Sequence, residues 1–513
     1  MVHTAPIRPS SGGFASLLAV TFAAVGCDEP EAASRAQPDP PLTPEAGFVE
    51  LARETYRVGQ TELVSSPARL FYDFQPAQEP GPEAPLFVLS GGGPAASVTF
   101  LLAYHAPHAI ADPSVTTATL ARNEWSLTRL GHLFSPDARN AGFSYALLDD
   151  PSDPALRDAE FRLDNYNVYR DAADAWQVLL DFLDRHPALS THPIYFLAES
   201  YGAVRVSVML SFVLHSAEYA NEQREFWAPG LFDRLAALHV GGQILLEPWF
   251  AGARQAMVAG QLLEQPGSVL EALAAEAGTT YVRCSEQAGD CDPYANARAL
   301  LDAIGRSPYD VRAGSDWSER HADLVANAAT QRDVLAGITG VDRSSLDQIL
   351  GGDRTRAYRF ADVGQGLFLE RGDLEQTYGP LQPWDAHFVP QSIEARDVFL
   401  SESANAVNAN PNQDRWGEVL LDNLRTTPTF MSRADFDFVI FGPALVPVLA
   451  SYPEVSGASL LNTSSGDRVQ VEFTDGTSRI VECPAYASSH SVSRDRPAEL
   501  FRDIAAFLGQ TQP

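Results

Sequence analysis

A serine inside a short run of small residues is the first group in this sequence that could do chemistry. Residues 197–203 read Leu-Ala-Glu-Ser-Tyr-Gly-Ala, which fits the pattern Gly-x-Ser-x-Gly with Ala198 in place of the first glycine. Small residues are needed there because a sharp turn from strand to helix leaves no room for larger side chains. Such a turn lifts the serine hydroxyl above the sheet and directs the next backbone N–H at a developing oxyanion. Ser200 is therefore a candidate nucleophile, with the N–H of Tyr201 as an oxyanion donor.

Two distant segments carry groups that a nucleophilic serine needs. Gly91-Gly92-Gly93-Pro94 follows a short apolar run, where a glycine-rich turn can supply a second oxyanion N–H. The same composition also occurs in ordinary turns. His490 lies between two serines, after the last strand that the sequence predicts and before the last predicted helix. The chain order serine, acid, histidine puts a general base at this place.

Alternating strands and helices must position these groups. Short apolar runs at 85–90, 193–197 and 238–246 predict buried strands, and the first two lead into the glycine-rich turn and the serine motif. Apolar residues spaced by three and four predict helices over 170–185 and 204–214. Further strands are predicted at 61–74, 131–134, 436–441 and 469–481, and a last amphipathic helix at 497–508.

This order of elements predicts one α/β core that is interrupted once. The first part of the core spans 46–250, and its last strands and helix span 431–513. The pattern over 251–430 is mainly helical and polar, which indicates a cap inserted between the two parts.

The composition excludes several kinds of chemistry and partner. The 513 residues include 66 acidic and 36 basic ones, for a net charge of −30, and every basic residue is arginine. Schiff bases, P-loop phosphate sites and kinase-type ATP sites need a lysine, so they are excluded. Nucleic acid is not an expected partner, because neutralising phosphates needs a basic face. No cofactor or metal is predicted, the expected partner is a peptide or a small acyl substrate, and the oligomeric state stays open.

The first 27 residues are typical of a secretory signal. Arg8 precedes an apolar stretch over 14–25, which is too short for a membrane span. Residues 24–27 resemble a bacterial lipobox, in which Cys27 would be lipidated; export without a lipid and a buried first helix are the alternatives. Residues 28–45 are polar and predict a disordered tether. We therefore expect an exported protein, held in the periplasm or cell envelope by a lipid or else secreted, with no other membrane contact.

Three further cysteines follow. Cys284 and Cys291 are seven residues apart in a polar segment, and in an oxidising compartment they are expected to form a disulfide. No other cysteine or histidine lies near this pair, and no His-Glu-x-x-His motif occurs, so a zinc site is not predicted. Cys483 is interpreted as a buried strand residue.

Four blocks of this sequence, in order, resemble the serine carboxypeptidase family. Residues 85–97 are similar to its strand and Asn-Gly-Gly-Pro-Gly-Cys-Ser loop, and residues 133–145 to its Ser-Pro and Gly-Phe-Ser-Tyr block. Residues 198–202 are similar to its Gly-Glu-Ser-Tyr-Ala-Gly motif, and residues 490–497 to its His-Met-Val-Pro-x-Asp-Gln-Pro motif. The resemblance implies an α/β-hydrolase fold with a doubly wound central sheet, a largely helical cap and peptidase activity.

The same resemblance implies roles for single residues. Ser200 would be the nucleophile and His490 the general base, while the N–H groups of Gly93 and Tyr201 would form the oxyanion hole. Two more positions that match the family's motifs would bind substrate: these are Gly92 and Glu199.

The sequence departs from the family where substrate is recognised. The family reads the C-terminal carboxylate of its substrate with an asparagine, a glutamate before Ser-Pro and the glutamate beside the serine. Those positions hold Gly91, Phe134 and Glu199 here, so one of the three residues is kept. C-terminal peptide recognition in the family's manner is therefore in doubt.

The acid of the triad is also missing where the family has it. The predicted strand over 436–441 runs into Gly-Pro rather than Gly-Asp, and Asp435 and Asp437 lie at its start, which is the wrong end of the sheet. Glu247 follows the predicted strand after the nucleophile helix, where some α/β hydrolases carry their acid. We take Glu247 as the predicted acid; the alternative is a surface carboxylate at the start of a loop.

These features lead to two main hypotheses for function. The first is an exported serine hydrolase that cleaves peptide or ester bonds, with esterase or acyltransferase activity as a variant of it. The second, suggested by the missing acid and by Gly91, is a catalytically degenerate binding protein on the same fold. A carbohydrate- or partner-binding cap is a third and weaker possibility, since no aromatic pattern supports it.

Overall fold

The computed structural model describes most of the chain from Leu42 onward. The described residues are 42–58, 61–79, 81, 84–92, 97, 101, 104–110, 120–150, 152–160, 168–221, 230–289, 291–312, 336–337, 348, 357–358, 415–463 and 466–511. The predicted signal with Cys27, nearly all of the predicted tether, and Gly93 lie outside these residues, so what was said of them stays a prediction. Among the described residues, no helix combines the length and the apolar character needed to cross a bilayer.

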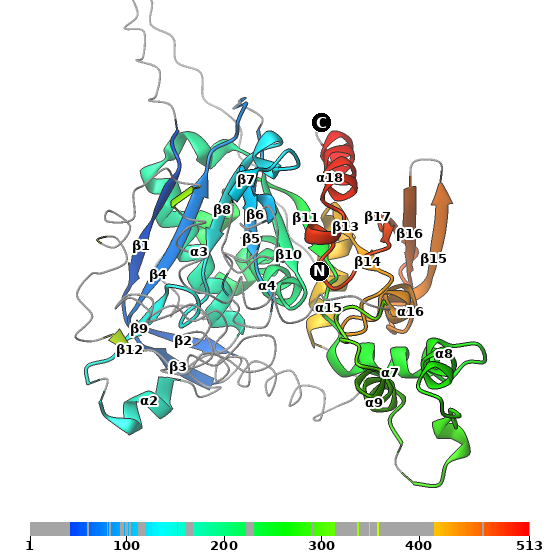
Figure 1. The fold of residues 1–513 in the computed structure, drawn as a ribbon. Coiled ribbons are helices and arrows are strands. Elements are labelled where there is room, and N and C mark those ends of the chain that lie inside the picture. Colours follow the sequence, from blue (N-terminus) through cyan, green and yellow to red (C-terminus); the bar gives the residue numbers. More distant parts are fainter. Residues whose placement is uncertain are drawn as a thin grey trace, which may run out of the picture. The chain divides into compact units, whose positions relative to one another are not determined.

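A mixed sheet forms the centre of this part of the chain (Figure 1). Its strands are β1 (Glu45–Leu51), β4 (Ala68–Gln75), β5 (Leu86–Ser90), β8 (His132–Pro136), β9 (Tyr145–Leu147), β10 (Ile194–Glu199), β11 (Val240–Leu246), β12 (Ala357–Tyr358), β13 (Thr429–Met431), β15 (Val455–Thr463), β16 (Gly466–Phe473) and β17 (Ser478–Glu482). Their order is β12-β9-β4-β8-β5-β10-β11-β13-β17-β16-β15, with β1 paired to β4. The strands from β8 to β17 in this order are parallel, so their carboxyl ends meet at one edge. Open α/β sheets bind ligands at that edge.

Strand β10 shows that the sheet is covered on both faces. Its even-numbered residues from Ile194 to Ala198 lie in a core with α3, α4 and α15, and its odd-numbered residues lie in a second core with α18. These helices are α3 (Val168–Arg185), α4 (Gly202–Leu214), α15 (Arg415–Thr426) and α18 (Pro497–Thr511). Successive side chains of a strand point to opposite faces, so a strand buried on both faces is apolar throughout. The predicted α/β-hydrolase fold with a doubly wound sheet is confirmed.

Short elements connect and flank this core. Three pairs of strands lie outside the central sheet: β2 (Glu54–Val58) with β3 (Thr61–Ser65), β6 (His108–Ile110) with β7 (Leu120–Arg122), and β14 (Arg433–Ala434) with β18 (Ala485–Tyr486). The shorter helices are α2 (Pro154–Glu160), α5 (Ser216–Asn221), α6 (Leu231–Ala236), α16 (Leu445–Ala450), α17 (Val492–Asp495), and the 3-10 turns η1 (Leu127–Arg129), η2 (Pro187–Thr191), η3 (Cys284–Glu286) and η5 (Gly442–Ala444).

Three helices follow β11 and pack on one another. They are α7 (Gly252–Leu263), α8 (Val269–Glu276) and α9 (Pro293–Ile304). Their apolar residues share a small core with Phe438, which comes from the segment after β13. A disulfide between Cys284 and Cys291 closes the loop between α8 and α9. The helices thus approach the sheet where its parallel strands end.

The strand predicted over 436–441 is wrong. The strand in this region is β13, which ends at Met431 and fills the position between β11 and β17. The apolar run that follows is a turn leading into η5 (Gly442–Ala444), and Phe438 packs against the helices α7, α8 and α9 instead of entering the sheet. Asp437 therefore lies beyond the carboxyl end of a strand rather than at the start of one.

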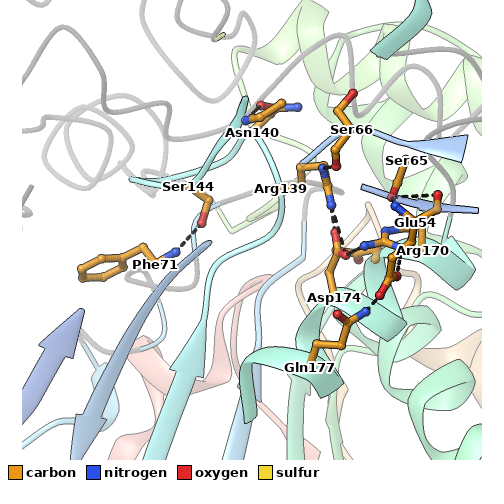
Figure 2. A network of polar contacts seen from close by, with 12 residues as sticks. Glu54, Ser65, Ser66, Phe71, Arg139, Asn140, Ser144, Arg170, Asp174 and Gln177 are labelled. Atoms are coloured by element: carbon orange, nitrogen blue, oxygen red, sulfur yellow. Dashed lines mark hydrogen bonds and ion pairs between the residues drawn. The ribbon is translucent and has the colours of Figure 1, made fainter. Parts of the chain in front are cut away.

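A buried network of ion pairs ties the amino-terminal half together (Figure 2). Arg139 donates to Asp174 over 2.9 Å and to the carbonyl of Ser66 over 2.6 Å. Arg170 pairs with Asp174 over 2.6 Å and with Glu54 over 2.6 Å. A neighbouring ion pair joins Arg205 to Asp171. Together these charged residues form what we call the arginine network: Glu54, Arg139, Arg170, Asp171, Asp174 and Arg205.

Candidate active site

Ser200 lies in the tight turn between β10 and α4. Its φ of 56° is in the left-handed region, which a residue other than glycine seldom adopts. Its N–H donates to the carbonyl of Leu246 over 2.9 Å, so β11 holds the turn in place. A Cβ on Gly92 would lie 2.7 Å from the Cβ of Ser200, and one on Gly202 would lie 2.3 Å from the carbonyl oxygen of Ser90. The turn is therefore possible only with small residues around it.

His490 and Asp437 form a bonded pair at the carboxyl edge of the sheet. The Nδ1 of His490 lies 2.6 Å from Oδ2 of Asp437, and both side chains are buried. The other carboxylate oxygen of Asp437 accepts the N–H groups of Val439 over 2.8 Å and Ile440 over 3.1 Å, which fixes the acid. With Nδ1–H donated to Asp437, Nε2 is the ring nitrogen left to accept a proton.

Glu247, the predicted acid of the triad, is not bonded to His490. Its Oε1 accepts from the hydroxyl of Ser432 over 3.0 Å, and the position bonded to His490 is taken by Asp437. The prediction that Asp437 lies at the wrong end of the sheet is wrong, because the strand that would have put it there does not form. A sequence signal for it did exist: Asp437 lies between Ser200 and His490 in the order that this fold requires.

Three carboxyl groups surround the one imidazole. We call the histidine cluster the residues Glu199, Glu247, Asp437 and His490. Burial lowers the pKa of His490, but the carboxylate of Asp437 together with the charges of Glu247 and Glu199 outweighs it and raises the value to about 9. Burial raises the pKa of Glu199 to about 7, against the opposing charges of His490 and Arg494.

Glu247 is the most deeply buried acid of the cluster that lacks a charged partner. It is 1% exposed, and burial followed by the charge of Glu199 raises its pKa well above the ordinary value. Among the described residues, neither Oε2 of Glu247 nor Oε2 of Glu199 has a hydrogen-bond partner. Burial and the neighbouring charge of Glu199 thus favour the protonated form of Glu247.

A pocket of about 290 Å³ opens beside Ser200. Tyr201 and Trp249 stack on each other along one wall, with ring centroids 5.3 Å apart. Ile440 and Phe441 line another part of it, so the apolar run that was predicted as a strand forms pocket wall instead. The pocket is the place where a substrate group next to the scissile carbonyl can be bound.

The predicted oxyanion groups are described in part. Tyr201 is the N-cap residue of α4, so its backbone lies at the positive end of that helix, whereas Gly93 lies outside the described residues. After the glycine-rich turn, Ser97 donates to Asp137 over 2.9 Å, and Asp137 also accepts the N–H of Phe143 over 3.1 Å. These bonds tie Ser97 to the loop after β8.

The two positions that depart from the family's motifs are both described. Gly91 adjoins Gly92 at the end of β5. Phe134 is fully buried in β8, with its ring centroid 4.8 Å from that of Phe182. A side chain held in the core in this way cannot take the place of a glutamate that reads substrate. In the described ranges no group of histidine, cysteine, aspartate and glutamate side chains is arranged to hold a metal ion.

Comparison with known proteins bears on the first half of this site. Residues 45–228 match the family model for serine carboxypeptidases. Serine carboxypeptidase-like 50 of Arabidopsis thaliana is 30% identical over 192 residues, which cover 36% of this chain and 38% of that protein. The chain thus matches well under half the length of this curated relative. The matched residues include Ser200 and the glycine-rich turn, but neither Asp437 nor His490.

A solved structure extends the likeness in fold to most of the chain. The crystal structure of a prohormone-processing carboxypeptidase of Saccharomyces cerevisiae is 11% identical, with a TM-score of 0.54 and 91% of each chain covered. At that identity the similarity concerns the fold alone. Residues 45–228 of this chain are therefore similar to the serine carboxypeptidase family, and the chain as described has the α/β-hydrolase fold.

Proposed function

We propose that this chain is a serine hydrolase that cleaves peptide or ester bonds with Ser200, His490 and Asp437. The observation that carries the proposal is the 2.6 Å contact between His490 Nδ1 and Asp437 Oδ2. It supplies the oriented and charge-stabilised base that a serine nucleophile needs. The turn at Ser200 supplies the other half of the arrangement, since its left-handed backbone exposes a hydroxyl at the amino-terminal end of α4.

In the proposed reaction, which uses the neutral form of His490 and is therefore expected to speed up as the pH rises toward about 9, Ser200 Oγ attacks the acyl carbonyl while His490 Nε2 takes the hydroxyl proton. The imidazolium is stabilised by Asp437, whose carboxylate is the main group that raises the pKa of His490 against the effect of burial. The oxyanion is stabilised by the N–H of Tyr201 and, as predicted from the sequence, by that of Gly93. His490 then passes its proton to the leaving group, and a water molecule activated by the same base hydrolyses the acyl-enzyme.

Peptides are the first substrate class, because the family match and the named relatives are carboxypeptidases or similar to them. Esters are the second, and Gly91 and Phe134 favour them: the family's carboxylate-reading side chains are absent at these positions. The alternative of a degenerate binding protein was suggested by a missing acid and by Gly91. The bond between His490 and Asp437 argues against the first of these reasons, and Gly91 stays as the second.

A fluorophosphonate probe tests this proposal without knowledge of the substrate. We expect the purified protein to be labelled on Ser200, as read by peptide mass spectrometry, because the probe reacts with activated serines. Ser200→Ala and His490→Ala should abolish labelling, and Ser152→Ala, at an exposed serine, should not. A folded protein that is not labelled, or that is labelled equally after His490→Ala, would overturn the proposal.

A further inference from the structure

The pocket beside Ser200 carries one arginine, and that arginine comes from α9. Tyr294 and Arg298 are four residues apart, so they lie on one face of the helix, and both line the pocket. The hydroxyl of Tyr294 donates to the carbonyl of Val439 over 2.9 Å, which ties this helix to the segment after Asp437. The guanidinium of Arg298 lies 5.5 Å from the centre of the Tyr294 ring. The helix thus presents a positive charge at the pocket wall, on a side chain that is exposed.

Arg298 differs from other arginines of the same region in its partners. Arg283 pairs with Glu271 over 2.7 Å, and Arg306 pairs with Glu276 over 2.5 Å. Arg298 forms no ion pair with any residue that the structure describes, although the chain has 66 acidic residues for 36 arginines. Arg298 is also the one charged residue among the described residues that line the pocket. A cation left without a carboxylate at a pocket wall is a binding group for an anionic ligand.

A second polar group of the pocket has an acceptor atom without a donor. Gln255 is 5% exposed, and its Nε2 donates to the carbonyl of Pro248 over 3.3 Å, which leaves Oε1 as the other end of the amide. No described residue donates to that buried oxygen. This oxygen is out of contact with solvent, so a ligand N–H group reaches it once the amide side chain has turned toward the pocket. Acyl groups derived from peptides carry such an N–H beside the carbonyl that is attacked.

We propose that this pocket binds a carboxylate of the substrate through Arg298 and an amide N–H of the substrate through Gln255. The proposal deepens the serine hydrolase function. It rests on that function in one respect, because it takes the bound carboxylate and N–H group to belong to the substrate that Ser200 attacks. The carboxylate has two possible sources, an acidic side chain on the acyl part or the terminal carboxylate of the leaving part. In either case Arg298 binds the carboxylate, because Gly91 and Phe134 carry no polar side chain that could bind it.

Two pairs of substrates distinguish these sources. The first pair is an N-blocked glutamyl aryl ester and its glutaminyl analogue, which differ in charge on the acyl side. The second pair is an N-blocked dipeptide with a free terminal carboxylate and the same dipeptide as its amide. We expect a preference of about 10-fold in kcat/KM for the anionic member of one pair, since a charge-assisted hydrogen bond contributes about that factor.

Variants of Arg298 show whether that preference comes from the pocket. Arg298→Gln should reduce it to about 1-fold, and Arg298→Glu should reverse it, while Arg234→Gln, an exposed arginine outside the pocket lining, should leave it unchanged. Equal kcat/KM values within both pairs for the unaltered protein, or a preference that survives Arg298→Gln, would overturn the proposal. Thermal unfolding of each variant confirms that it is folded.

A binding measurement separates this proposal from the hydrolase itself. In Ser200→Ala protein, calorimetric titration with the blocked glutamate and the blocked dipeptide acid should give a Kd about 10-fold lower than with their amides. Adding Arg298→Gln should remove the difference. Binding of this kind without hydrolysis by the unaltered protein would refute the hydrolase and support the pocket. Hydrolysis without any effect of Arg298 on binding or on kcat/KM would refute the pocket and leave the hydrolase.

Discussion

Two buried groups of charged side chains lie in the same α/β core and are built differently. In the arginine network three arginines face three carboxylates, through ion pairs of 2.5 to 2.9 Å. In the histidine cluster three carboxyl groups surround one imidazole, and only Asp437 is bonded to it. The network connects the β2–β3 hairpin, the loop after β8 and helix α3, whereas the cluster lies at the edge where the parallel strands end.

The difference shows that charge balance decides which buried acids are ionised. Burial raises the pKa of Asp174, but Arg139 and Arg170 outweigh it and bring the value below the ordinary one. Burial also raises the pKa of Glu199 and of Glu247, and the single imidazole does not reverse the effect for either. Asp171 still has its pKa raised by burial although it pairs with Arg205, so within the network the balance holds at Asp174, whereas the unbalanced cluster can exchange protons near neutral pH. The first arrangement suits stability and the second suits catalysis.

The largest expected effect comes from the cluster and concerns activity. Asp437→Asn keeps the shape of the side chain but removes the charge that orients and stabilises the imidazolium of His490. We expect kcat to fall by about 10⁴-fold with little change in thermal stability, measured with an ester that the unaltered protein cleaves.

Glu247→Gln is the matched control for that variant, because Glu247 is equally buried but bonds to Ser432 rather than to His490. We expect it to lower kcat by less than about 10-fold. The reverse result, in which Glu247→Gln is the more damaging exchange, would mean that Glu247 and not Asp437 is the acid of the triad.

The next effect comes from the arginine network and concerns stability. Asp174→Asn leaves Arg139 and Arg170 buried without the carboxylate that they share. Breaking a buried ion pair from one side costs about 3 to 5 kcal/mol, so we expect the free energy of unfolding in urea to fall by that amount. Asp181→Asn, at an exposed carboxylate of the same helix α3, is the control. A drop of less than about 1 kcal/mol at Asp174 would remove the contrast between the two groups.

The smallest effect is a pH dependence of stability that arises in the cluster. The pKa of Glu199 is about 7 in the folded protein against 4.5 ordinarily, so between these values the native state holds more protons than the unfolded chain. The contribution of Glu199 to the free energy of unfolding is fully present below about pH 4.5 and is lost as the pH rises through about 7. At about 1.4 kcal/mol per pKa unit, the loss is at most about 3.5 kcal/mol.

Urea unfolding of the unaltered protein and of Glu199→Gln at several pH values checks this expectation. The difference in free energy of unfolding between the two proteins should decline from pH 4.5 to 7, and Glu124→Gln, at an exposed glutamate, should show no such decline. A difference that is constant over this range would mean that Glu199 is ionised throughout.

The parts of the site that depend on neighbours in sequence could be predicted. Ser200 was found because the constraint on its turn is local: the strand, the small residues and the helix are adjacent in the chain. Cys284 and Cys291 are likewise close in sequence, and they are bonded. The helices over 170–185 and 204–214 were predicted within a few residues, because each buries a continuous apolar face in one core.

Asp437 could not be placed from the sequence because its position depends on a competition between distant segments. The apolar run after it is suited to a strand, but β13 fills the place between β11 and β17. The run therefore packs against α9 and lines the pocket. Arg298 belongs to the same group of contacts, since its approach to the pocket depends on how α9 lies against that run. No local pattern carries that information.

The left-handed backbone of Ser200 also restricts which sequences can descend from this one by single substitutions. Threonine carries a hydroxyl too, but it is branched at Cβ, and branched residues are strongly disfavoured at a φ near 56°. Cysteine is unbranched and fits the same backbone. Evolution can therefore exchange the alcohol at this turn for a thiol in one step, whereas a secondary alcohol would first require a different turn.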